Sequence, residues 1–130
     1  MNAPTEAQCQ ATIIAAAMIS GWRVHAERPG MTRSGNWATQ IQGHPGYPDI
    51  TMCRHNQLWF IELKKRPNKI EPAQQAWQDA INTAALSYAP ARLNIAAFTV
   101  WVPEEQDAFI RQLTDGDPDI TQFVYRDTVR

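Results

Sequence analysis

Three polar residues near the middle of the chain have the types and spacing that metal-assisted hydrolysis requires. Asp49 opens the apolar run DITMC at 49–53, and Glu62 and Lys64 stand at the end of a second run that begins with LWFI at 58–61. Two carboxylates supply the hard oxygen ligands that Mg²⁺ or Mn²⁺ prefers. An ammonium group beside them can stabilise negative charge that develops on a substrate. The candidate chemistry therefore depends on folding that brings these three side chains together.

The register of a predicted hairpin opposes the two carboxylates. Residues 54–57 are polar and predict a four-residue hairpin loop, which pairs Cys53 with Leu58 and Asp49 with Glu62. Directly opposed side chains share a face, with Cβ atoms roughly 4.5–5.5 Å apart. Two carboxylates in this position repel each other, and a divalent cation between them reverses the sign of the interaction.

Lys64 projects from the same face as Glu62, because side chains alternate along a strand. The opposite face of the hairpin is apolar throughout (Ile50, Met52, Trp59, Ile61 and Leu63). The polar face also becomes apolar away from the carboxylates, so the sheet needs helices on both sides. The structural alternatives are an ordinary strand entry at Asp49 and an edge-strand charge pair of Glu62 with Lys64.

The remaining pattern alternates helices and strands and predicts one α/β domain over residues 1–130. A capping box of Thr5 with Gln8 begins a helix that Gly21 ends, and Glu71 with Pro72 at the first helical position begins another. Further elements are expected as strands at 22–26, 37–41 and 94–102, a helix at 104–113 and an edge strand at 120–126. The apolar stripes of the first two helices are expected at Ala7, Ala11, Ile14, Ala15 and Met18, and at Ala73, Trp77, Ile81 and Ala84. Between them, the glycine-rich and proline-containing stretch 28–47 has the length of a functional loop.

Composition narrows the classes of function. The net charge of −1 conceals an asymmetry, since residues 1–70 carry eight Lys and Arg against four Asp and Glu, and residues 71–130 carry four against nine. This distribution allows a basic face for a phosphate backbone on a nearly neutral protein. Two cysteines form no disulfide framework or zinc cluster, and no apolar run is long enough to span a membrane. We expect a cytoplasmic protein without a small-molecule cofactor.

Together these motifs resemble a known family. The segments GYPDI at 46–50, FIELKK at 60–65 and IEPAQQAW at 70–77 are similar to the VRR-NUC branch of the PD-(D/E)XK nucleases, in a stand-alone phage or bacterial form. VWVP at 100–103 and the N-terminal helix with Glu6 and Gln10 extend the similarity over about residues 5–115. The resemblance implies a restriction-endonuclease-like fold, with a central mixed β-sheet flanked by helices on both faces.

The resemblance also implies roles for individual residues. Asp49 and Glu62 would bind Mg²⁺ or Mn²⁺ with help from the backbone carbonyl of Leu63. Lys64 would position the attacking water and stabilise charge on the phosphate. Gln74 would line the site from the start of the second helix. The implied products carry 3′-hydroxyl and 5′-phosphate ends.

Several candidate residues have competing interpretations. Glu6 matches an acidic metal ligand of the family, but a first-turn acid also stabilises a helix dipole, and Glu27 is an alternative carboxylate. Gln74 also occupies a capping position. Trp37 is either a core anchor or a base-stacking platform, and His44 is either a solvated loop residue or a DNA contact. Five basic residues flank the site and are candidates for phosphate contacts: Arg28, Arg33, Lys65, Arg66 and Lys69.

The leading hypothesis is a metal-dependent DNA endonuclease that selects branched, Holliday-junction-like DNA and acts as a homodimer. The alternatives are a nicking or restriction-like nuclease on linear duplex and a DNA-binding module without catalysis. An RNA- or nucleotide-processing hydrolase also fits the metal site, which by itself does not distinguish DNA from RNA.

Overall fold

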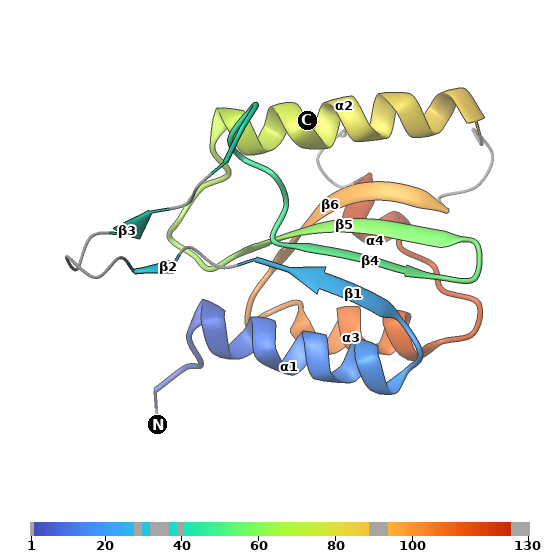
Figure 1. Ribbon diagram of the computed structural model, residues 1–130. Coiled ribbons are helices and arrows are strands. Elements are labelled where there is room, and N and C mark those ends of the chain that lie inside the picture. The colour runs from blue at the N-terminus through green and yellow to red at the C-terminus, as the bar shows by residue number, and fades with distance from the viewer. Residues whose placement is uncertain (1, 28–29, 32–36, 39–40, 89–93, 126–130) are drawn as a thin grey trace.

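The chain forms an α/β architecture in which helices flank a four-stranded mixed sheet (Figure 1). A computed structural model describes residues 2–27, 30–31, 37–38, 41–88 and 94–125. Arg28 and Arg33, two of the basic candidates, lie outside the described residues. Within these ranges, no helix is long and apolar enough to cross a membrane.

The central sheet has the strand order β1-β4-β5-β6. Its strands are β1 (Arg23–Ala26), β4 (Ile50–Arg54), β5 (Gln57–Lys64) and β6 (Ile95–Trp101). β4 pairs with both β1 and β5 in antiparallel orientation, and β5 pairs with β6 in parallel. Two short strands, β2 (Gly30–Met31) and β3 (Trp37–Ala38), form a separate antiparallel sheet. β3 begins at Trp37 as expected, whereas β2 was not predicted.

The hairpin of β4 and β5 has the predicted register but a shorter turn. Cys53 pairs with Leu58, as expected, and the ladder continues to a further pair of Arg54 with Gln57. The turn therefore contains two residues, not four. His55 accommodates it with a φ of 53°, since two-residue hairpin turns require left-handed backbone.

Helices cover both faces of the sheet. In Figure 1, α2 (Pro72–Tyr88) lies across one face, and α1 (Glu6–Ile19) and α3 (Gln106–Thr114) lie across the other. The predicted capping box is confirmed: Thr5 Oγ1 accepts from the backbone N–H of Gln8, and Gln8 Oε1 accepts from that of Thr5.

An aromatic cluster fills the core between the sheet and α1, α3 and α4 (Thr121–Val124). The indole of Trp59 lies 4.4 Å from that of Trp22 and 5.9 Å from the rings of Phe98 and Phe109, measured between centroids. Trp22 Nε1 donates to the carbonyl of Leu113 at 2.7 Å, so its polar atom is satisfied inside the core. These contacts fasten β1 and β5 to α3.

Two predictions about α1 and the C-terminal segment were wrong. The buried residues of α1 are Cys9, Gln10, Ile13 and Ala17, whereas Met18, from the expected stripe, is exposed. Apolar residues are spread around this alanine-rich helix, so the sequence pattern alone did not identify the face that is buried. The expected edge strand at 120–126 is instead α4 (Thr121–Val124). Ile120 and Phe123 are both buried, and a spacing of three suits a helical turn better than a strand.

The contact between α2 and the sheet also differs from the prediction, because it is polar. Gln78 Nε2 donates to Thr99 Oγ1 at 2.7 Å. The amide of Asn82 donates to the carbonyl of Ala97 at 2.9 Å and accepts from its N–H at 2.7 Å. Ala84, from the expected apolar stripe, is exposed. Amide side chains four residues apart therefore attach this helix to β6, and Asn82 satisfies backbone groups on the edge of the sheet.

Candidate active site

Glu62 and Lys64 lie at the end of β5, on the face of the sheet that α2 covers. Both side chains are buried, with 3% and 9% of their surface exposed. Asp49 directly precedes β4, and the register of the hairpin continues to place it opposite Glu62. Two carboxylates and an ammonium group thus meet at one end of a buried sheet.

At this end of the hairpin, the Asp49 side chain replaces a backbone partner of Leu63. The N–H of Leu63 donates to Asp49 Oδ2 at 2.8 Å. The next position of the register, opposite Leu63, is Pro48, which has no N–H to donate to the Leu63 carbonyl. In a strand, the N–H and carbonyl of one residue point to the same side, so this carbonyl lies on the side of Asp49. The geometry fits the expected use of the Leu63 carbonyl as an oxygen ligand.

Burial and charge repulsion, in that order, control the electrostatics of the pair. Burial, followed by the charge of Asp49 and a hydrogen bond with it, raises the pKa of Glu62 to about 9, against the opposing effect of Lys64. Near neutral pH, Glu62 therefore holds a proton that it shares with Asp49. A divalent cation between the carboxylates would displace this proton, because metal ligation requires the ionised form.

Glu6 belongs to the same electrostatic group. Burial raises its pKa first, and the charge of Asp49 raises it further, while Lys64 and a hydrogen bond from the backbone N–H of Lys65 lower it. The first turn of α1 therefore reaches the end of β5. Glu27, the alternative carboxylate, instead lies 3.3 Å from His25 in an exposed pair.

Gln74 both caps a helix and contacts the carboxylate pair, the two roles that its sequence position left open. Its Nε2 donates to Glu62 Oε2 at 3.1 Å, and its Oε1 accepts from the backbone N–H of Glu71 at 2.9 Å. One side chain thus caps the start of α2 and orients the buried carboxylate. Its amide contributes no charge of its own, so it can bond Glu62 without further changing the charge balance.

The segment before Asp49 is pressed against the start of α2. Gly46 has a φ of +93°, and a Cβ built on it would lie 2.5 Å from the carbonyl carbon of Ala73 and 2.8 Å from the N of Gln74. Trp77 Nε1 donates to the carbonyl of Pro45 at 3.1 Å. Gly46 therefore permits the close approach that brings Asp49 and Gln74 to Glu62 from opposite sides.

Sequence reasoning did not identify Gly46, Tyr47 or Trp77 as supports of the site. Tyr47 lies edge-on to both Trp77 and Phe60, and its hydroxyl shares a 2.8 Å hydrogen bond with Thr51 Oγ1. Trp77 was expected as part of an apolar stripe and of the segment IEPAQQAW, but not as a contact of the loop before Asp49. The available signal was the glycine that immediately precedes Tyr-Pro-Asp, since a glycine there allows close contact with another backbone.

The oxygen donors gathered here fit Mg²⁺ or Mn²⁺ better than a soft metal. They are the carboxylates of Asp49 and Glu62, the Leu63 carbonyl and, at the edge of the group, Glu6. Among the described residues, no three Asp, Glu, His or Cys side chains converge as a complete set of metal ligands. Any cation held here would therefore combine the carboxylate pair with backbone or solvent oxygen.

The described basic candidates differ in what they contact. Lys65 Nζ donates to the carbonyl of Pro4 at 2.8 Å, which holds the chain before α1 against β5. The guanidinium of Arg66 lies over the ring of Trp101. Lys69 and His44 are exposed, and the His44 carbonyl is a second, longer acceptor for Trp77 Nε1. The structure therefore gives Lys65 a structural contact and leaves Arg66 at the surface.

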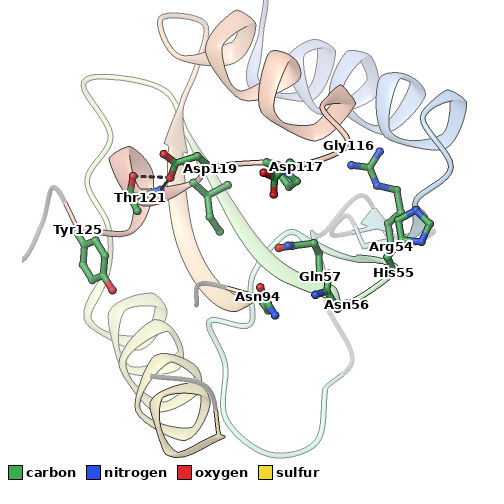
Figure 2. A pocket seen from close by; sticks show the side chains of 12 residues that line it. Arg54, His55, Asn56, Gln57, Asn94, Gly116, Asp117, Asp119, Thr121 and Tyr125 are labelled. Carbon is green, nitrogen blue, oxygen red and sulfur yellow. Dashed lines mark hydrogen bonds between the residues drawn. The ribbon is translucent and has the colours of Figure 1, made fainter. Parts of the chain in front are cut away.

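A cavity lies at the other end of the sheet. It has a volume of about 510 Å³ and is lined by the turn between β4 and β5, the segment after α3 and the start of α4 (Figure 2). Two of its charged side chains bond to the protein itself: Asp119 accepts from Thr121, and the guanidinium of Arg54 donates to the carbonyls of Ser20 and Asp115. Its charged lining residues are Arg54, Asp117 and Asp119, and we assign the cavity no catalytic role.

No model of a known protein family matches the chain, and a search of curated proteins gave no match. The basis for assigning a function is therefore the arrangement of the side chains.

Proposed function

We propose that this protein is a metal-dependent nuclease of the PD-(D/E)XK type, with a restriction-endonuclease-like fold and the motifs of the VRR-NUC branch. The observation that carries the proposal is the meeting of Asp49, Glu62 and Lys64, with Glu62 buried and its pKa raised to about 9 beside Asp49. Strongly perturbed acids in such an arrangement are more typical of functional sites than of structural ones. The Gln74 amide and the close packing at Gly46 further support a site built for a fixed geometry.

Mg²⁺ or Mn²⁺ bound to Asp49, Glu62 and the Leu63 carbonyl would lower the pKa of bound water and stabilise charge on the phosphate. Lys64 holds a positive charge on the same face, where it would attract the phosphate and counter negative charge that develops on it. Gln74 holds the Glu62 carboxylate toward Asp49 through its Nε2. Burial around Glu62 excludes competing solvent and strengthens each of these electrostatic contacts.

The proposed substrate is DNA with a branched, junction-like structure, cut by a homodimer. A small domain offers little surface for reading a sequence of bases, and two copies would place two active sites across a junction. Cleavage of linear duplex and DNA binding without cleavage are the alternatives that the first experiment distinguishes.

That experiment measures cleavage of a labelled four-way junction and a matched linear duplex in Mg²⁺, Mn²⁺ or EDTA. Wild type is expected to cut the junction only with metal, and Lys64→Ala to reduce the rate by about 10²–10³-fold, because an electrostatic contact to the developing charge is lost. Arg111→Ala, which removes an exposed charge from the last turn of α3, is the matched control.

The outcomes separate the alternatives. Preference for the linear duplex would replace the junction substrate. Binding without cutting in any metal would favour the non-catalytic module. Undiminished cutting by folded Lys64→Ala would show that the site has been placed wrongly, and cutting of RNA in preference to DNA would change the substrate class.

A further inference from the structure

Beside the carboxylate pair, the same end of the sheet carries a second charged arrangement. The guanidinium carbon of Arg66 lies 4.3 Å from the centroid of the Trp101 ring, in a cation–π contact. Arg66 is exposed, while Trp101 is half-buried. The ring thus supports a permanently charged group at the protein surface.

The register places this pair next to Lys64. Trp101 ends β6 and pairs with Lys64 across the parallel strands, and Arg66 follows Lys64 by two residues. Residues paired in this way project from the same face, and neighbouring strands lie roughly 4.8 Å apart. Across the sheet, the acid Asp49 therefore lies on the β4 side of β5, and the Arg66–Trp101 pair on its β6 side.

The backbone of Trp101 is anchored on both of its polar atoms. Its N–H donates to Glu105 Oε1 at 2.7 Å, and its carbonyl accepts from the N–H of Glu105 at 2.7 Å. These bonds satisfy the backbone N–H and carbonyl that β6 exposes on its outer edge where the strand ends. Because Arg66 already lies over the Trp101 ring, its side chain loses less conformational entropy when it binds a ligand.

We propose that Arg66, positioned by Trp101, is a phosphate-binding residue for the DNA strand that flanks the scissile phosphate. The inference rests on the proposed nuclease function and extends it to the path of the substrate. A guanidinium presents a planar set of donors that matches two phosphate oxygens. The contrast with the adjacent Lys65 supports this choice, because its ammonium group is bound to the Pro4 carbonyl. Trp101 acts through Arg66 and is a positioning residue.

The test measures equilibrium binding of a fluorescent four-way junction at several salt concentrations, with Ca²⁺ in place of Mg²⁺. Arg66→Ala is expected to weaken binding about tenfold and to reduce the slope of log affinity against log salt by about one, as for one lost phosphate contact. Trp101→Leu is expected to weaken binding while Trp101→Phe, which keeps an aromatic face, restores most of the affinity. Arg111→Ala removes an equal charge elsewhere and is expected to bind as wild type does.

The inference is overturned if Arg66→Ala has the affinity and the salt slope of Arg111→Ala. Equal binding by Trp101→Leu and Trp101→Phe would overturn the role of the ring. If wild type cuts DNA in Mg²⁺ while Arg66→Ala binds normally, this inference alone fails. If wild type neither binds nor cuts DNA, the proposed function fails with it.

Discussion

On the face of the sheet that meets α1 and α3, alternate residues of β5 and β6 pack as an apolar cluster around Trp59 and Phe98. On the face that meets α2, the intervening residues of the same strands include Glu62, Lys64 and Thr99, and amide side chains of the helix bind Glu62, Thr99 and the backbone of Ala97. The first face gains free energy from burial of apolar surface, without strict orientation. The second face is held by hydrogen bonds, which require a fixed orientation, and it contains charged groups whose burial costs free energy. One sheet therefore combines a stabilising face with a face that carries the groups of the proposed active site.

The largest expected effect tests the apolar face. Phe98 is 1% exposed and has ring centroids of Trp59, Phe109 and Phe123 within 5.9 Å. Phe98→Ala is expected to lower the free energy of unfolding by about 3–5 kcal/mol, because it leaves a cavity in the core. Urea denaturation measures this loss.

Leu86→Ala is the control for that substitution, since Leu86 is 54% exposed on α2. It is expected to change the stability by less than about 1 kcal/mol. A Phe98→Ala variant no less stable than Leu86→Ala would contradict the division between the two faces.

The second prediction concerns the cost of charge on the polar face. The pKa of Glu62, raised to about 9 in the folded protein from an ordinary 4.5, means that the folded state binds the proton more tightly than the unfolded state. Its contribution to stability is therefore fully present below about pH 4.5 and is lost as the pH rises toward 9. Without metal, wild type should lose on the order of 4 kcal/mol between pH 5 and 8, at about 1.4 kcal/mol for each pH unit.

Glu62→Gln removes this titration and should flatten the corresponding part of the pH profile. At pH 8 without metal, the variant is expected to melt at a higher temperature than wild type. Mg²⁺ or Mn²⁺ should stabilise wild type but not Glu62→Gln, because the metal ligand is lost. Parallel pH profiles of the two proteins would show that Glu62 does not carry the unfavourable charge.

The smallest expected effect tests how the loop before Asp49 packs against α2. Gly46 and Gly43 both have positive φ, at +93° and +95°, but a Cβ at Gly46 meets the backbone of α2 whereas one at Gly43 meets nothing within 4 Å. Gly43→Ala should cost about 1 kcal/mol through its backbone conformation alone. Gly46→Ala should cost about 1–3 kcal/mol more, because its Cβ would overlap the backbone of Ala73 and Gln74. It should also weaken metal binding, since Asp49 moves away from Glu62.

Thermal melts and metal titrations of this matched pair separate the two contributions. Equal melting temperatures and equal metal affinities in Gly43→Ala and Gly46→Ala would show that contact with α2 does not seat Asp49. The comparison holds backbone strain nearly constant, so the difference reports the steric contact.

The central hairpin and its opposed carboxylates could be predicted from the sequence because they follow from local rules. Strand side chains alternate, and the strand pairing sets every later pair, so Asp49 faces Glu62 whether the turn has two residues or four. The capping box of Thr5 and Gln8 is local in the same sense. Such features depend on residues only a few positions apart or on one paired ladder.

The sequence by itself determined the strand register, the two sides of β5 and the residue types at its end. Only the tertiary structure decided that α1 brings Glu6 to this end, that α2 brings Gln74 to Glu62, and that Gly46 packs against Ala73. It also decided that residues 121–124 form a helix and that α2 contacts β6 through amides. These outcomes depend on contacts between segments distant in the chain, and a weakly amphipathic helix or a short apolar segment does not specify its neighbour until the whole core is packed.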